Sequence, residues 1–311
     1  EYTAWMRERW NHPSVVIWDA QNESKTPETG KALQAVRSLD LSNRPWENGW
    51  AEPQSFEDCV ESHPYLFISA WQDKEPFRLK DMVKVPAEPR LLPAQQKLTL
   101  PIIVNEYGWL WLTREGEVTS LTGKVYESLL GPDSSIDQRR HIYARYLAAL
   151  TEFWRSHRQA AGVLHFCGLG YSRAGDKPRP EGGATSDHFL NLENLEFEPY
   201  FEKYVRDSFS PVGIMLDFWE EEVPVEALNE VKVYVINDLY RDWEGKVELR
   251  LKKGDDTLDV SSQPCRVTAL GRESISFTVN FPSTAGKFEL SAELAGDSGE
   301  LIRSVREFRS R

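Results

Sequence analysis

Short apolar runs alternate with amphipathic segments through the first two thirds of the chain. Each run is continuous and has the length of a strand, a pattern typical of strands that are buried on both faces. The runs span Ser14–Asp19, Pro64–Ser69, Leu100–Asn105 and Ala161–Phe166.

Helical spacing separates these runs. Pro27–Leu41 places Leu33 and Val36 on one stripe behind a capping residue, Thr26, and Ser135–Ser156 repeats apolar residues every three or four positions. A closing helix is predicted at Glu198–Asp207. Strands and helices in this order predict an α/β fold with a parallel sheet or a (β/α) barrel.

The pattern changes near Ser208–Gly213. Beyond it, apolar and polar residues alternate with period two and are separated by turn signals such as Lys253–Asp256. This pattern predicts an antiparallel β-sandwich, with strands over Val231–Asn237, Gly245–Leu251, Ser274–Val279 and Phe288–Leu294. We therefore predict two domains, an α/β domain at residues 1–208 and an all-β domain at residues 209–311.

Composition narrows the classes of function. The chain has 311 residues, 40% of them hydrophobic, and a formal net charge of −12, which is typical of a folded protein. This charge argues against nucleic acid or an anionic membrane as a partner. Three widely spaced cysteines, Cys59, Cys167 and Cys265, fit neither a disulfide framework nor a metal site, and we expect buried free thiols. Asp187-His188 offers too few ligands for a metal, so no metal or other cofactor is expected.

Two glutamates follow predicted strands. Glu23 comes shortly after Ser14–Asp19, and Glu106 directly follows Leu100–Asn105. In a (β/α) barrel, the residues at the carboxyl ends of the strands face the active site. Two carboxylates at one barrel mouth are what glycoside hydrolysis requires, one to transfer a proton and one to attack the sugar or activate water.

The residues around both glutamates resemble glycoside hydrolase family 2, the β-galactosidase, β-glucuronidase and β-mannosidase family of retaining (β/α)8-barrel enzymes. Asn11–Trp18 followed by Asn22-Glu23 is similar to the acid/base segment of the family, and Pro101–Gly108 is similar to its nucleophile strand. Asn43-Arg44-Pro45 resembles the intervening strand. The resemblance implies that this is the C-terminal part of the barrel, about strands 4–8, followed by an immunoglobulin-like sandwich.

The resemblance also implies roles for individual residues. Glu23 is the expected acid/base, Glu106 the nucleophile, and Asn22 the partner of the sugar 2-hydroxyl. His63 or Tyr65 lies where the family orients its nucleophile. His165 stands where the family often has a tryptophan at the sugar-binding floor. Apart from the resemblance, Trp109 lies near a predicted βα loop, where stacking on a sugar face and ordinary packing are the two alternatives.

The expected protein is thus a retaining, β-galactosidase-like glycosidase with a β-glycoside substrate. The chain begins at Glu1 without a methionine, and we expect it to be cut from a longer parent whose N-terminal domains supply further contacts. We expect the parent to be the glycosidase and the isolated piece to be weakly active or inactive. Family habit suggests an extracellular or periplasmic location, and the sugar and the oligomeric state stay open. The alternative is a non-catalytic carbohydrate-binding or scaffolding protein that keeps the barrel.

Overall fold

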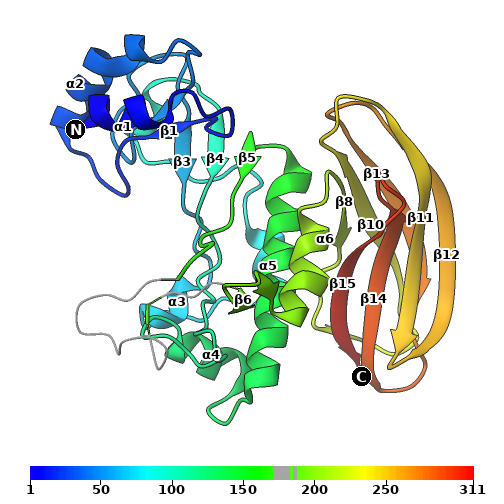
Figure 1. Cartoon of the computed structure of the whole chain (residues 1–311). Helices are drawn as coiled ribbons and strands as arrows, with labels where there is room; N and C mark the ends of the chain where they lie inside the picture. Colours follow the sequence, from blue (N-terminus) through cyan, green and yellow to red (C-terminus); the bar gives the residue numbers. More distant parts are fainter. Residues whose placement is uncertain (171–182, 185–187) are drawn as a thin grey trace. The chain divides into compact units, whose positions relative to one another are not determined.

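The chain is seen in a computed structural model that describes residues 1–170, 183–184 and 188–311 (Figure 1). It divides into two compact units, each built from several stretches of sequence. The first unit comprises Glu1–Pro64, Glu88–Tyr107 and Arg158–Phe166, and the second comprises Tyr65–Ala87, Gly108–His157 and Cys167–Arg311. The division between residues 208 and 209 stays a prediction.

The first unit is built on short parallel strands. β1 (Trp18–Asp19) pairs with β2 (Trp46–Glu47), and a three-stranded parallel sheet has the order β3-β4-β5. The strands of that sheet are β3 (Val60–Ser62), β4 (Ile102–Val104) and β5 (Gly162–Val163), which lie side by side in Figure 1. Parallel strands separated by helices agree with the predicted α/β class.

Two helices and stacked indoles form the core beside β1 and β2. α1 (Tyr2–Arg9) contributes Met6 and α2 (Pro27–Val36) contributes Leu33, both fully buried. The rings of Trp18 and Trp46 stack with centroids 5.6 Å apart. The predicted helix ends at Val36 and continues as a 3-10 turn, Arg37–Leu39, and a second 3-10 turn spans Gln95–Lys97.

One predicted strand is wrong. Pro64–Ser69 is not extended, because the strand lies earlier in the chain, at β3, and a short helix, α3 (Ile68–Trp71), follows. Pro64 has no N–H to continue a ladder, so the strand ends before it.

The second unit contains the longest helix, α5 (Ile136–His157), which confirms the predicted helix at Ser135–Ser156. The other helices among the described residues of this unit are α3, α4 (Gly123–Leu130), a 3-10 helix at Leu79–Lys84, a π-helical turn at Phe201–Val205 and α6 (Arg206–Ser208). A small hairpin joins β6 (Phe189–Asn191) to β7 (Glu196–Phe197).

Residues 212–311 form two sheets around one apolar core (Figure 1). One sheet has the order β13-β10-β8 and the other β12-β11-β14-β15-β9. The strands are β8 (Val212–Asp217), β9 (Glu222–Val223), β10 (Leu228–Asn237), β11 (Trp243–Lys253), β12 (Asp256–Val267), β13 (Arg272–Asn280), β14 (Gly286–Ala295) and β15 (Leu301–Ser310). The predicted all-β region is thus a two-layered sandwich, antiparallel except for the β9–β15 pair.

A buried ion pair joins α5 to β15. Glu152 Oε2 accepts hydrogen bonds from Ser304 Oγ at 2.6 Å and from an Arg306 guanidinium nitrogen at 2.8 Å. Burial raises the pKa of Glu152, and the facing charge of Arg306 opposes that rise. The three cysteines are buried free thiols, as predicted. No helix within the described part of the chain is long and apolar enough to cross a membrane.

Candidate active site

The loop after β1 carries Asn22 and Glu23. Glu23 has a φ of +48°, a left-handed conformation that costs a non-glycine residue free energy and is common at functional sites. The loop packs against Gly49, where a Cβ would lie 2.6 Å from the Gln21 carbonyl oxygen, so only glycine fits there. Gln21 also donates to Asn48 Oδ1 at 2.8 Å. The end of β2 therefore fixes the backbone on which Glu23 stands.

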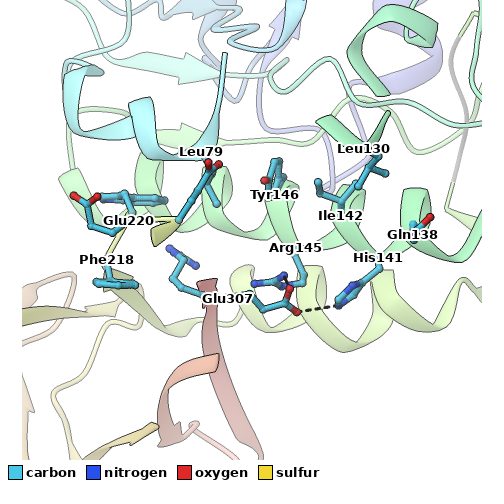
Figure 2. A pocket seen from close by; sticks show the side chains of 13 residues that line it. Leu79, Leu130, Gln138, His141, Ile142, Arg145, Tyr146, Phe218, Glu220 and Glu307 are labelled. Atoms are coloured by element: carbon cyan, nitrogen blue, oxygen red, sulfur yellow. Dashed lines mark ion pairs between the residues drawn. The ribbon is translucent and has the colours of Figure 1, made fainter. Parts of the chain in front are cut away.

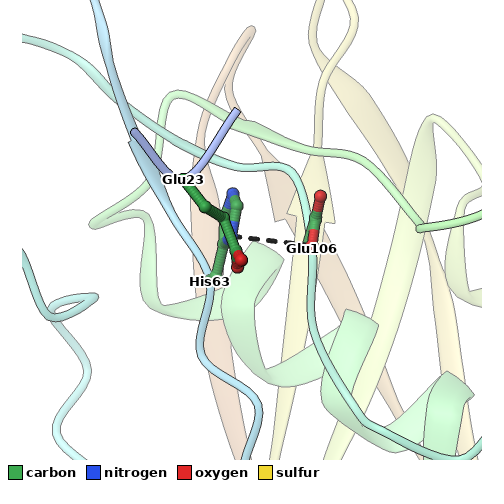
Figure 3. Close-up of side chains that lie close together, drawn as sticks. All are labelled: Glu23, His63 and Glu106. Atoms are coloured by element: carbon green, nitrogen blue, oxygen red, sulfur yellow. Dashed lines mark hydrogen bonds and ion pairs between the residues drawn. The ribbon is translucent and has the colours of Figure 1, made fainter. Parts of the chain in front are cut away.

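Glu23 and Glu106 meet at His63. The Nδ1 atom of His63 lies 2.9 Å from Glu23 Oε1 and 3.5 Å from Glu106 Oε2. One carboxylate oxygen of Glu23 and one of Glu106 lie within 4.8 Å of each other. Figure 3 shows the imidazole beside both carboxylates. The side chains of His63 and Glu106 are 4% and 14% exposed and that of Glu23 is 42% exposed, so the site opens at Glu23.

A buried carboxylate stands behind His63. Glu61, in β3, accepts from His63 Nε2 at 3.2 Å and from Asn105 Nδ2 at 3.1 Å. Burial of the ring lowers the pKa of His63, but the hydrogen bond with Glu61 and the charges of Glu106 and Glu23 outweigh it and raise this pKa to about 9. His63 is therefore an imidazolium at neutral pH.

A second acidic group lies next to Glu61 in the first unit. Oxygens of Asp19, Glu47 and Glu61 lie within 4.8 Å of one another. Burial and the charges of Asp19 and Glu61 raise the pKa of Glu47 to about 8, and burial and the charge of Glu61 raise that of Asp19 to about 6. Glu47 thus holds a proton at neutral pH. Cys59 Sγ lies 3.7 Å from Glu47 Oε1, and burial raises the pKa of its thiol.

Two sets of side chains have ligand atoms close enough to share one cation. The first is Glu23, His63 and Glu106, and the second is Asp19, Glu47 and Glu61. Carboxylate oxygens suit hard cations such as Mg²⁺ and Ca²⁺. The first set consists of the predicted catalytic pair and its bridging histidine, so a cation there would compete with the positive charge of His63.

His165 follows β5 in the same unit. Its ring centroid lies 6.1 Å from that of Tyr107. Burial lowers the pKa of His165 to about 3, so the ring is neutral at physiological pH. Asn22 is exposed beside Glu23, and its carbonyl accepts from Ser24 Oγ. The first unit therefore contains five of the predicted site residues: Asn22, Glu23, His63, Glu106 and His165.

Tyr65 and Trp109 belong to the second unit, where they are part of an aromatic cluster. The Trp109 ring lies 5.0 Å from Tyr65, 4.9 Å from Trp111 and 5.4 Å from Trp71, measured between centroids. Trp109 has a φ of +82°, and its Nε1 donates to the Leu121 carbonyl oxygen at 3.0 Å. The position of the Trp109 ring is thus fixed by the backbone conformation of this residue and by the hydrogen bond of its indole N–H.

The sequence interpretation missed Glu61 and Glu47. Both occupy short parallel strands, where inward-facing residues point into a barrel. The signal that was available is an acidic residue within an apolar strand segment, Cys59-Val60-Glu61, since such residues are rarely fully buried without a partner. Asp187, named above with His188, lies outside the described residues.

A separate cavity of about 190 Å³ lies within the second unit (Figure 2). Its lining mixes aromatic and charged side chains, including Tyr146, His141 and Arg145, and Arg145 pairs with Glu307 at 2.6 Å. None of the predicted site residues is among the described residues that line it.

Carboxylates that follow short parallel strands are the arrangement that a glycoside hydrolase of the α/β-barrel type requires. Residues 2–129 match the family of glycosyl hydrolases family 2, TIM barrel domain. The resemblance to glycoside hydrolase family 2 that the motifs gave is therefore confirmed over this part of the chain.

Solved structures give distant likenesses. One is the FMN-binding β-glucuronidase from Faecalibacterium prausnitzii L2-6, with 14% identity, a TM-score of 0.41 and coverage of 100% of this chain and 43% of the other. Another is a Paenibacillus cycloisomaltooligosaccharide glucanotransferase, with 18% identity, a TM-score of 0.26 and coverage of 31% of this chain and 13% of the other. TM-scores this low do not establish a shared overall fold. No curated protein matches the sequence.

Proposed function

We propose that this chain carries the catalytic pair of a retaining β-glycosidase that acts on terminal β-linked sugars, with a β-galactosidase-like preference. The observation that supports this function is the approach of the Glu23 and Glu106 carboxylates to within 4.8 Å, with His63 between them. Retaining glycosidases hold their two carboxyl groups about 5–5.5 Å apart, whereas inverting enzymes need about 6.5–9.5 Å to admit a water molecule.

The first chemical step joins the sugar to Glu106. A Glu106 oxygen attacks the anomeric carbon, the bond to the leaving oxygen breaks, and Glu23 gives its proton to that oxygen. In the second step water attacks the anomeric carbon, Glu23 takes the water proton, and the bond to Glu106 breaks. The greater exposure of Glu23 suits a group that meets both leaving group and water.

His63 fits both steps as a donor shared by two carboxylates. While Glu23 carries the proton, the Nδ1–H of His63 donates to ionised Glu106, whose Oε2 lies 3.5 Å away. Once Glu106 is esterified, the same N–H donates to the carboxylate of Glu23, its nearer partner at 2.9 Å. Asn22 would bind the sugar 2-hydroxyl, a contact that strengthens in the oxocarbenium-like transition state.

We assign the remaining predicted site residues to substrate binding. Trp109 and Tyr65 offer aromatic faces for sugar rings, and His165 offers a neutral ring. We also propose that the parallel strands correspond to about strands 4–8 of the family barrel and that the C-terminal sandwich is immunoglobulin-like.

The experiment that tests the function is covalent trapping. A 2-deoxy-2-fluoro-β-galactoside with a good leaving group slows both steps, because the fluorine destabilises the positive charge of the transition state. We expect the mass of the chain to rise by one fluorosugar and peptide mapping to place the sugar on Glu106. A label on another residue, or an unlabelled chain that releases the fluorosugar at no measurable rate, would overturn the assignment.

The rival is a carbohydrate-binding protein without turnover. Glu106→Gln separates the two, because removing a nucleophile lowers turnover by several orders of magnitude while sugar binding persists. A panel of nitrophenyl β-glycosides of galactose, glucose, glucuronate and mannose tests the proposed sugar. Equal rates for wild type and Glu106→Gln would favour the rival.

A further inference from the structure

The carboxylate of Glu61 is fully buried behind the proposed catalytic pair. Its side chain is 0% exposed and lies in the middle of β3, where Glu61 is in register with Ile103 of β4. Gln95 Nε2 donates to its carbonyl oxygen at 2.9 Å, which fixes the backbone further. The position of this carboxylate is therefore set by the sheet and not by a mobile loop.

The contacts of Glu61 determine the state of the His63 ring. A carboxylate only accepts hydrogen bonds when it is ionised, so a ring placed between carboxylates must supply hydrogens from both nitrogens. Nε2 of His63 faces Glu61 at 3.2 Å, and Nδ1 faces Glu23 at 2.9 Å. Asn105 Nδ2 donates to the same Glu61 oxygen at 3.1 Å and fixes its orientation.

We propose that Glu61 is a positioning residue, which holds the His63 ring by Nε2 so that a positively charged imidazolium presents its Nδ1–H to Glu23 and Glu106. The proposal rests on the glycosidase function above and extends it. Glu61 acts through His63 and reaches no reacting atom itself.

A stability role alone accounts poorly for this residue. Oε1 of Glu61 is buried and has no hydrogen-bond partner among the described residues, and a second acid, Asp19, lies close by. An unsatisfied buried carboxylate oxygen costs free energy, and an amide of the same shape would carry less of that cost. Departures of this kind from a stable core are expected at functional sites.

Several groups face His63 and bear on its protonation. The carboxylates of Glu61, Glu106 and Glu23 favour the charged ring, and the more distant Asp19 acts in the same direction, whereas Glu47 is protonated at neutral pH and adds no charge there. The Trp50 ring, 6.0 Å away between centroids, shields one side and carries no charge. Among these, Glu61 is the one that contacts Nε2.

The test compares Glu61→Gln with Glu47→Gln in the whole chain. The two glutamates are neighbours and are buried to within a few per cent. Glu61 supplies the hydrogen bond to Nε2 of His63, so Glu47→Gln changes a neighbouring buried carboxyl without removing that contact and serves as the control. The first readout is the titration of the His63 ring by NMR, with His63→Asn to assign the signal, and this readout needs no turnover.

We expect Glu61→Gln to lower the His63 titration midpoint by about one pH unit or more, the size of effect that one close charge has. We also expect kcat/KM to fall about 10–100-fold, with its alkaline limb moved to lower pH by the same amount. Glu61→Asp, which keeps the charge, should recover part of the loss. Glu47→Gln should change both readouts less than Glu61→Gln does, because it leaves the hydrogen bond at Nε2 in place.

An unchanged His63 midpoint in Glu61→Gln would overturn the proposal, as would an equal change in Glu47→Gln. Failure of the glycosidase function looks different: Glu106→Gln would be as active as wild type, or the fluorosugar would not label Glu106. If Glu106 is labelled and Glu61→Gln behaves like wild type, the function stands and the role of Glu61 does not.

Discussion

The imidazole of His63 lies 2.9 Å from the carboxylate of Glu23, although 40 positions separate the two residues in the sequence. The contact joins the loop after β1 to the end of β3, and Glu106 at the end of β4 approaches the same nitrogen. The proposed acid/base group and the proposed nucleophile thus share one hydrogen-bond donor. The consequences can be measured one residue at a time.

Glu23→Gln should affect substrates according to their leaving groups. A nitrophenolate leaves without a proton, so its first step survives and the second step becomes slow, which lowers kcat and KM together. An alkyl β-galactoside needs the proton, and its kcat/KM should fall by several orders of magnitude. Steady-state kinetics with both substrates check this. An equal fall for both would contradict the acid/base role.

Trp71→Ala tests the aromatic cluster around Trp109. Trp71 is 40% exposed, so the substitution should leave the fold intact, and the loss of one stacking face should raise KM about 2–10-fold with little change in kcat. Tyr240→Ala, at a ring that is 90% exposed in the sandwich, is the control and should leave KM unchanged. A KM unaffected by Trp71→Ala would argue against sugar binding at this cluster.

Glu47→Gln should stabilise the protein at alkaline pH. The pKa of Glu47 is about 8 in the folded chain and about 4.3 when unfolded, so folding loses stability as pH rises through this interval and the loss is complete above pH 8. Glutamine cannot ionise, so the variant does not lose this stability as the pH rises. We expect the free energy of unfolding to rise by on the order of 1–3 kcal/mol at pH 8.5 and to change little at pH 4. Urea titrations at both pH values measure this, and a gain of the same size at pH 4 would refute the explanation.

Arg306→Met should strongly destabilise the second unit. It leaves the carboxylate of Glu152 buried without its cation, which typically costs about 3–5 kcal/mol. The Trp219 ring, 4.5 Å from the Arg306 guanidinium, loses its cation–π partner as well. The double variant Glu152→Gln/Arg306→Met should recover much of the loss, because no charge is left buried. Additive losses in a double-mutant cycle would show that the two residues do not act as a pair.

The sequence allowed Glu23 and Glu106 to be predicted because each follows an apolar run that marks a buried parallel strand. Glu61 was not predicted as a site residue, because the sequence pattern placed the strand at Pro64–Ser69, whereas the structure has it at Val60–Ser62. The role of such a residue depends on what lies opposite it, here His63 and Asn105. The pattern of hydrophobic and polar residues along the chain does not predict which side chains lie opposite Glu61.

In the sandwich, the sequence pattern likewise predicted some strands and missed others. Alternation predicted the strands that have one face in the core, such as β10 and β13, but not β12 and β15. β12 is at the edge of its sheet, where polar residues and Pro264 are tolerated, so its pattern reads as a loop. β15 has a charged residue, Arg306, at a buried position, where it forms an ion pair with Glu152 of α5. This buried charge interrupts the alternation of apolar and polar residues by which a strand is predicted.

The path of the backbone through the two units has a further consequence. The chain passes from one unit to the other after residues 64, 87, 107, 157 and 166. A protease that nicks the chain once, or a gene cut at one codon, therefore cannot release either unit as a separate polypeptide. Efforts to minimise this protein would have to re-order its segments by circular permutation and new linkers, since truncation alone removes parts of both units.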